Sequence, residues 1–439
     1  MRDLVLWSVL LALAPWGAFG QTGHWDSALK SAQRAYREGH YGEAELQFLH
    51  AQKEAESYGP SDYRVATTLN NLGVLYQREA KCADAERAFK QALEIWEKAE
   101  SSHTADLATT LNNLAALYTY QSRYAEAEPL YRQCLALREN NLGPDHPEVA
   151  NALNNLGESY YEQGKFSEAE PLYRRAILIK EKALGPEDAT LAASLNNLAS
   201  LYSRQGRYAE SESLYKRSLS IRQAAFGTEH PEVANSVNNL ASLYSLEGRY
   251  SDAEPMYLRS LSMAEKFLGP NHPDVACGLN NLAELYFSQK NYAKAEPLLR
   301  RSLSIREKAL GPENPLVAQS LENLAGVLLV EYKQVSVDLL YLRALAIRKK
   351  AFGAESPEAV ASLTNLAAAY TREGKFAEAE QTSSDELTII TRQPKPDAPS
   401  LAAVYSNLAN LYSLEGKHKK ARKMAERARS IRKQQESPS

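Results

Sequence analysis

The sequence is poor in cysteine and has no large excess of either charge. Among its 439 residues it has three cysteines, Cys82, Cys134 and Cys277, and an odd number of thiols cannot fully pair as disulfides. Lysine and arginine number 51 against 54 aspartates and glutamates, which gives a formal net charge of −3. We therefore expect neither a disulfide framework nor a nucleic-acid partner.

Long apolar runs are also scarce. The N-terminal run from Leu4 to Ala14 is too short to cross a bilayer, which takes about 20 residues. A charged start precedes it, and Pro15 and the small residues Ala18 and Gly20 follow it, as in a signal peptide. The sequence predicts a signal peptide over residues 1–20, cleavage near Gly20, and a periplasmic or secreted protein.

What the sequence has in abundance is repetition. The motif LNNLAALY begins at Leu111, and close copies of it recur at a fixed step of 42 residues. A period between 20 and 50 residues is typical of solenoids and related arrays. The nine anchors are Leu69, Leu111, Leu153, Leu195, Val237, Leu279, Leu321, Leu363 and Tyr405.

Each repeat contains two stretches with helical spacing. Apolar or small residues separated by three or four positions run from Leu153 to Tyr160 and predict a helix from about Pro147 to Glu162. A second helix is predicted from about Ser167, with Glu170 closing a capping box, up to the stop at Gly185. The fold class is therefore all-α, a solenoid of antiparallel helix pairs.

The large, small and aromatic positions of these pairs resemble the tetratricopeptide repeat, and the 42-residue step resembles the repeats of kinesin light chain. The resemblance implies a right-handed superhelix. It gives a partial capping repeat over 21–58, nine tandem units over 59–433 and a disordered tail over 434–439. The seventh unit is irregular near 330–340, where its turn lacks the usual glycine. The positions that carry the resemblance are Leu153, Leu156, Gly157, Tyr160, Ala169, Tyr173 and Ala176.

The second asparagine of the motif is the strongest candidate for a functional side chain. With Leu111 at zero on a helical wheel, Asn113 lies at about 200°, opposite the predicted buried face. The resemblance implies a concave groove lined by the first helices, in which these amides and an outer row of arginines bind an extended peptide. The alternative is that each amide bonds to the neighbouring repeat and fixes the stacking. The candidate residues are Asn71, Asn113, Asn155, Asn197, Asn239, Asn281, Asn323, Asn365, Asn407, Arg78, Arg204 and Arg372.

No catalytic or metal-binding motif stands outside the repeats. The sequence has no phosphate-binding loop, HExxH or GxSxG motif. His146, His230 and His272 recur before prolines, about 10 Å apart if repeats stack as packed helices, which is too far for one metal ion. We therefore predict no enzymatic activity, no cofactor and no metal site.

The predicted function is a protein-interaction scaffold that binds an extended peptide of unknown identity in its groove. The alternative is a structural adaptor in a cell-envelope or polysaccharide-export assembly, which would use its convex face and ends. The C-terminal segment 417–433 holds nine lysines and arginines and one glutamate. It is predicted to be a solvated capping helix, and weak contact with an anionic surface is its functional alternative.

Overall fold

The computed structural model describes residues 23–99, 103–331, 337–392 and 398–436, and these residues form helices joined by short turns, with no strand among them. The helices are α1 (His24–Arg37), α2 (Tyr41–Glu56), α3 (Tyr63–Arg78), α4 (Cys82–Lys98), α5 (Thr104–Tyr120), α6 (Tyr124–Leu142), α7 (Pro147–Glu162), α8 (Phe166–Leu184), α9 (Leu191–Arg204), α10 (Tyr208–Phe226), α11 (Pro231–Leu246), α12 (Tyr250–Leu268), α13 (Pro273–Ser288), α14 (Tyr292–Leu310), α15 (Pro315–Glu331), α16 (Asp338–Phe352), α17 (Pro357–Glu373), α18 (Phe376–Arg392), α19 (Ala398–Leu414) and α20 (His418–Glu436).

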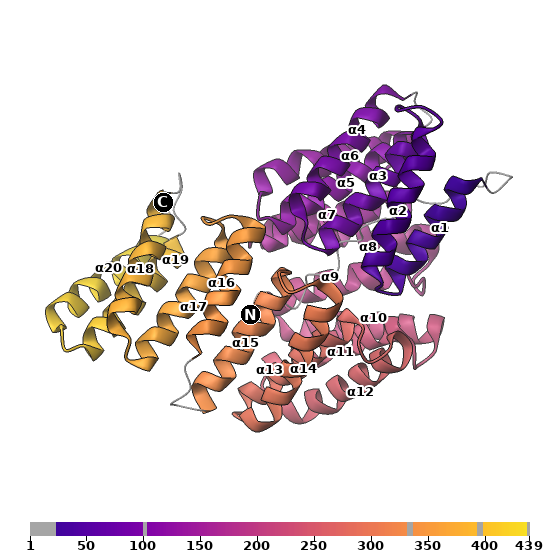
Figure 1. The fold of residues 1–439 in the computed structure, drawn as a ribbon. Coiled ribbons are helices and arrows are strands. Elements are labelled where there is room, and N and C mark those ends of the chain that lie inside the picture. The colour runs from indigo at the N-terminus through magenta and orange to yellow at the C-terminus, as the bar shows by residue number, and fades with distance from the viewer. Residues whose placement is uncertain (1–22, 100–102, 332–336, 393–397, 437–439) are drawn as a thin grey trace. The chain divides into compact units, whose positions relative to one another are not determined.

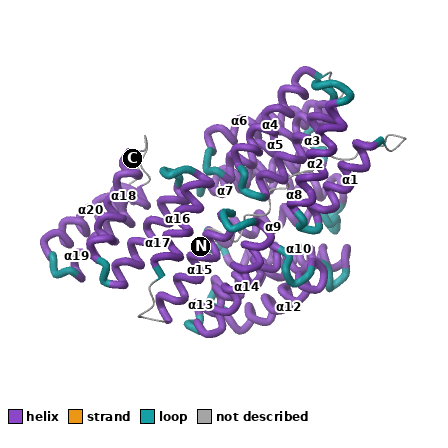
Figure 2. Tube along the Cα trace, viewed as in Figure 1, coloured by secondary structure: helices purple, strands orange, loops and turns teal. Residues whose placement is uncertain are grey.

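Consecutive helices pack in antiparallel pairs, such as α5 with α6, α7 with α8 and α17 with α18, as Figures 1 and 2 show. We call the members of a pair the first and the second helix. The predicted bounds of the first helix, Pro147 to Glu162, are those of α7. His146 caps this helix, because its Nδ1 accepts the N–H of Glu148 at 3.2 Å, as a connector residue should.

The predicted capping box at the start of α8 is wrong. The helix begins one residue earlier than expected, at Phe166, whose ring packs against Tyr161 with centroids 5.8 Å apart. Ser167 instead donates to the neighbouring Glu168 at 2.8 Å. Glu170 is therefore not used as a cap, and its carboxylate is available for a contact with the next repeat.

Small residues let the two helices of a pair approach closely, as predicted. A Cβ atom added to Gly157 would lie 2.8 Å from the ring of Tyr173, and one added to Gly73 would lie 2.5 Å from Phe89. Both aromatic side chains are fully buried. A larger residue at either glycine would force the aromatic ring out of its place in the core.

The described chain forms two compact units. Unit 1 extends to Gln289 and includes 308–310, so it contains α1–α13; unit 2 consists of 290–307 and the chain from Gly311 onwards, with α15–α20. In unit 1 the first helices α3, α5, α7 and α9 are enclosed by their neighbours, and every residue of α5 from Ala108 to Thr119 is buried. In unit 2 the first helices keep an exposed side, described below.

Two of the predicted segments fall outside the described residues. The signal peptide, 1–20, is one, and the centre of the irregular stretch, 332–336, is the other. At the C-terminus, α20 continues to Glu436, which lies within the tail predicted to be disordered. No helix of the described chain is long and apolar enough to cross a membrane.

Candidate functional site on the first helices

The repeated asparagines of unit 1 form a ladder between repeats. Asn113 Nδ2 donates to Asn70 Oδ1 at 3.0 Å, and Asn155 Nδ2 donates to Asn112 Oδ1 at 2.7 Å. The second asparagine of one repeat thus bonds to the first asparagine of the repeat before it. The same bond joins Asn281 to Asn238 at 3.0 Å.

The predicted exposure of Asn113 is therefore wrong, since this residue is fully buried. A helical wheel assigns one buried face to a helix, the face that contacts its own partner. In this array a first helix also contacts the first helices of the preceding and following repeats. The side opposite the pair interface is therefore covered as well, and a buried amide there needs a hydrogen-bond partner.

Burial of the candidate amides decreases towards the C-terminus. These amides occupy the same position in every repeat, so the difference in their burial comes from the residues that surround them. Asn71, Asn113, Asn155 and Asn197 are buried; Asn239, Asn281 and Asn407 are partly buried; Asn323 and Asn365 are exposed.

The candidate amides of unit 2 lie in a row of mostly small and polar side chains that we call the inner stripe; Asn323 and Asn365 are exposed there and Asn407 is partly buried. On α17 the exposed members are four residues spaced as one helix face, and the row continues on α15 and α19. At the equivalent positions of α5, Thr109, Asn113 and Ala116 are all buried. The inner stripe consists of Asn323, Ala361, Asn365, Ala368, Arg372, Ala403, Asn407, Asn410 and Leu414.

The ladder changes before two amides of the inner stripe, Asn365 and Asn407. At the position of the first asparagine, the seventh unit has Glu322, whose carboxylate accepts from Ser362 at 2.5 Å and from Arg348 at 2.8 Å. The next repeat has Thr364 at that position. Asn365 and Asn407 therefore lack the preceding asparagine that serves as ladder partner in unit 1.

Comparison with known proteins identifies the type of repeat. The tetratricopeptide repeat model matches residues 32–98, 106–182, 190–266, 238–308, 274–331 and 362–434, which is most of the chain. The chain belongs to the tetratricopeptide repeat family. A search of the curated proteins finds no match.

Solved tetratricopeptide-like structures resemble it over different lengths. A Rap protein complexed with competence and sporulation factor is 14% identical, with 85% of this chain and 99% of that chain covered and a TM-score of 0.52. Aspartyl phosphate phosphatase F from Bacillus subtilis is 15% identical, with 82% and 92% covered and a TM-score of 0.50. A putative kinesin light chain of Podosopora anserina with nearly identical repeats is 25% identical, with 48% and 98% covered and a TM-score of 0.39.

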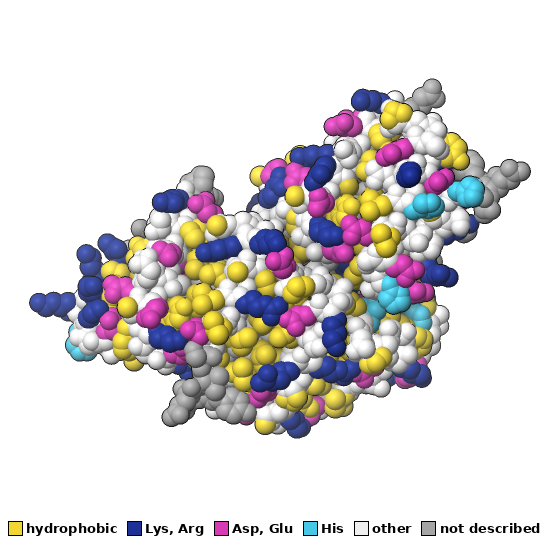
Figure 3. All heavy atoms as spheres, in the orientation of Figure 1, with side chains coloured by type: hydrophobic (Ala, Val, Ile, Leu, Met, Phe, Trp, Pro, Cys, Tyr) yellow, Lys and Arg dark blue, Asp and Glu magenta, His cyan; other side chains and the backbone are white. Residues whose placement is uncertain are grey.

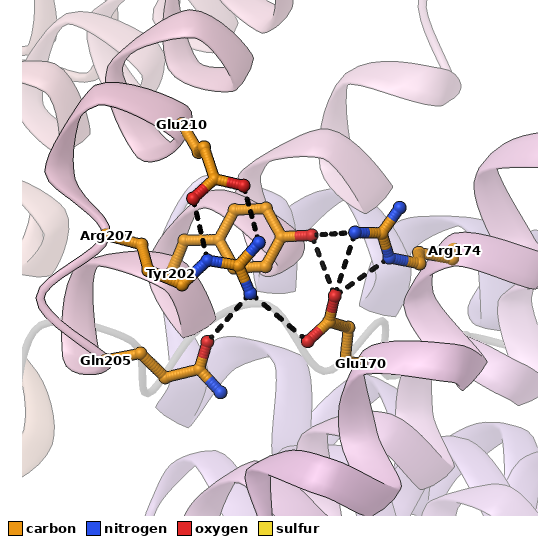
Figure 4. Close-up of polar contacts among 6 residues, drawn as sticks. All are labelled: Glu170, Arg174, Tyr202, Gln205, Arg207 and Glu210. Carbon is orange, nitrogen blue, oxygen red and sulfur yellow. Dashed lines mark hydrogen bonds and ion pairs between the residues drawn. The ribbon is translucent and has the colours of Figure 1, made fainter.

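Neighbouring tetratricopeptide units are also joined by a polar clamp (Figure 4). Glu170 of α8 accepts a hydrogen bond from the Tyr202 hydroxyl at 3.0 Å and one from an N–H of Arg207 at 3.3 Å. Both residues belong to the next repeat. The Arg207 guanidinium lies 3.7 Å from the centre of the Tyr202 ring and also pairs with Glu210. The equivalent tyrosine-to-glutamate bonds, 2.7 to 3.0 Å long, join Tyr118 to Glu86, Tyr160 to Glu128, Tyr244 to Glu212, Tyr286 to Glu254 and Tyr412 to Glu380.

The sequence contained a signal for the clamp, the constant separation of 32 residues between glutamate and tyrosine. The predicted capping box assigned Glu170 to its own helix and so missed its partner Tyr202 in the next repeat. In the best-bonded example, burial raises the pKa of Glu86, but hydrogen bonds from Arg123, Lys90 and Tyr118 outweigh it and lower the pKa to about 2. The clamp therefore stabilises the ionised form of the Glu86 carboxyl group.

We expect Glu86→Gln to lower the free energy of unfolding at pH 7 by roughly 1–3 kcal/mol. Because the folded-state pKa is depressed, this stabilisation is present above the unfolded value of 4.5 and is lost as the pH falls towards 2. Urea unfolding at several pH values measures the difference between wild type and variant. Glu94→Gln, on the exposed side of the same helix, is the control. A difference that did not shrink in acid would contradict the assignment.

The candidate arginines do not form one row. Arg78 has a nearly buried side chain that donates to Tyr41 Oη at 2.9 Å and to Asp274 Oδ1 at 3.0 Å. Arg78 joins α2 and α3 to the start of α13 within unit 1. Its side chain therefore stabilises the fold and is not open to a ligand. Arg204 and Arg372 are exposed, on different units.

No metal-binding cluster of three or more histidine, cysteine or carboxylate side chains is found in the described part of the chain. Its three cysteines are free thiols. Burial raises the pKa of Cys82 to about 11 in spite of its bond to Gln121, so this thiol stays protonated at neutral pH. What the first helices offer chemically is hydrogen bonding and small exposed side chains, which suits binding.

Proposed function

We propose that this tetratricopeptide scaffold binds an extended segment of another protein along the inner stripe of unit 2. The observation that carries the proposal is the difference between equivalent positions: Asn113 and Ala116 are buried in α5, and Asn365 and Ala368 are exposed in α17. An exposed amide offers a donor and an acceptor to a ligand backbone, and an exposed alanine lets that backbone come close.

The spacing of the amides suits an extended ligand. Packed helices lie 8–10 Å apart, and an extended chain advances about 3.3 Å per residue. A segment that crosses α15, α17 and α19 would therefore meet an amide at about every third residue. The three amides Asn323, Asn365 and Asn407 would contact a segment of about seven residues.

Such a ligand would be recognised mainly through its backbone. The inner stripe carries one cation, Arg372, and its other members are alanine, asparagine and leucine. Arg372 lies at one end of the α17 row, where it can pair with an acidic side chain of the ligand. We propose low sequence selectivity along the segment and one acidic position near this arginine.

The test begins with capture of partners by the mature chain and identification of the bound segment. Its affinity is then measured by calorimetry for wild type and for Asn365→Ala/Asn407→Ala. Loss of two hydrogen bonds, each worth about 0.5–1.5 kcal/mol, should weaken binding roughly tenfold or more, with the melting temperature unchanged. Ser384→Ala/Thr388→Ala, on the exposed side of α18, is the matched control.

Two results would contradict the proposal. One is unchanged affinity in the Asn365→Ala/Asn407→Ala variant, which would place the partner on the convex face or the ends and favour the adaptor function. The other is a weakened affinity that is matched by the α18 control, since it would show that any change in unit 2 has the same effect.

We also propose that the protein acts after export. The support is the short apolar run from Leu4 to Ala14 with the small residues Ala18 and Gly20 after it. Cell fractionation and N-terminal sequencing test this, and we expect a processed protein that starts near Gln21. An unprocessed cytoplasmic protein would contradict it.

A further inference from the structure

The last helix of the array breaks the charge rule that joins the repeats. At the internal clamps a second helix presents a carboxylate to the next repeat, as Glu170 does to Tyr202 and Arg207 and as Glu380 does to Tyr412. A second carboxylate acts further along the helix, where Glu181 pairs with Arg217 at 2.7 Å. At these two positions α8 presents a carboxylate to the next repeat, while Arg174 beside Glu170 also donates to Tyr202, at 2.6 Å.

In α20 the equivalent positions are basic. Forty-two residues after Glu380 stands Arg422, and the position that corresponds to Glu181 holds Lys433. Between them, Arg429 replaces the apolar residue that fills the junction elsewhere, such as Ile177. The three cations follow one another at intervals of seven and four residues, which places them on one face of the helix.

This face of α20 is open to solvent. The side chain of Arg422 is 84% exposed and its ion pair is with Glu426 of the same helix, at 3.1 Å. Arg429 and Lys433 are exposed as well. In the space-filling view, lysine and arginine side chains gather at the α20 end of unit 2 (Figure 3).

A second copy of the chain does not fit this face. A copy stacked head to tail would place α1 against α20, and α1 has the exposed Arg34 at the position that corresponds to the clamp tyrosine, Tyr76. Arginine would then face arginine, which is unfavourable. The terminal face therefore disfavours a second copy stacked head to tail and favours a surface of opposite charge.

We propose that the outer face of α20, formed by Arg422, Arg429 and Lys433, docks an acidic helix of a partner protein in the place where a further repeat would stack. The occupant follows from the junctions themselves. In the clamps of Glu86, Glu170, Glu212 and Glu380 a helix lies against a helix and a carboxylate faces a cation of the next repeat, so a helix that meets these three cations has to supply the carboxylates. This surface is separate from the inner stripe, and its test does not depend on that proposal.

The experiment uses the full mature chain and a fluorescein-labelled synthetic helical peptide with three glutamates at intervals of seven and four residues. Fluorescence anisotropy measures its affinity for wild type, for Arg422→Glu/Arg429→Glu and for Lys423→Glu/Arg427→Glu. The second pair lies on another exposed side of α20 and changes the net charge equally. We expect the first variant to bind at least tenfold more weakly, the second to bind as wild type does, and salt to weaken wild-type binding.

A charge-reversed peptide, with lysines in place of the glutamates, should bind the Arg422→Glu/Arg429→Glu variant and not the wild type. Circular dichroism of both variants is expected to match that of the wild type, which checks that they fold. Equal loss in both variants would overturn the proposal, because it would show nonspecific charge attraction. Equal binding of a peptide with glutamines in place of the glutamates would also overturn it, as would self-association of the protein through this face. A further contradicting result is saturable binding of phosphatidylglycerol vesicles that depends on Arg422, with no binding of the peptide.

Discussion

Replacing Ala116 by arginine should destabilise unit 1 by about 4 kcal/mol or more, because the side chain would enter a fully packed space. Ala116 is 2% exposed and belongs to the hydrophobic core that extends from Val74 to Ile221. A guanidinium at this position would have to be desolvated or would have to separate neighbouring first helices. Denaturant unfolding followed by far-UV circular dichroism measures the loss.

The same replacement at Ala368 should leave the stability unchanged. Ala368 occupies the equivalent position, six steps of 42 residues later, and its side chain is exposed on the inner stripe. An arginine there extends into solvent, where a surface substitution has an effect of about 0.5 kcal/mol or less. Destabilisation of the same size at both sites would show that the inner stripe is not open.

The second large effect is expected from pH, through Glu386. The corresponding residues in other repeats are small, such as Cys134, Ala176 and Ser218. Glu386 is 1% exposed, and one of its oxygens accepts from Thr364 at 2.5 Å. Burial raises its pKa to about 7, although the bond from Thr364 acts in the opposite direction.

The sign of the effect follows from the raised pKa. Burial favours the protonated carboxyl, so its stabilisation is complete below the unfolded value of 4.5 and is lost as the pH rises through about 7. Unit 2 should therefore lose roughly 3 kcal/mol of unfolding free energy between pH 4.5 and 8. Glu386→Gln should remove this loss and be more stable than wild type at pH 8. Parallel pH profiles of the two proteins, from urea unfolding, would contradict the prediction.

The fold could be predicted from the sequence because a repeat presents the same pattern nine times. The spacing within residues 147–162 predicted α7, and Gly157 and Tyr173 pack as their sizes indicated. The site could not be predicted in the same way. The exposure of Asn113 depends on the first helices before and after it, and the pattern of a single helix contains no information about those neighbours.

The useful signals were departures from the repeat. Glu322 and Thr364 replace the first asparagine of the motif in their repeats, and Asn365 is exposed in the repeat after that of Glu322. Glu386 interrupts a row of small residues, and Arg422 interrupts a row of carboxylates. Each departure changes the contacts of a position that is constant or uniformly small in other repeats, so it is recognised only when the sequence is aligned to its own period.

Site-specific photo-crosslinking tests the proposed function most directly. A benzophenone side chain is placed at Ala368, on the inner stripe, or at Ser384, on the exposed side of α18, and each protein is irradiated with its partners present. Peptide binding along the inner stripe predicts a crosslinked partner from position 368 and none from position 384. Crosslinks from 384 alone, or equally from both positions, would contradict it.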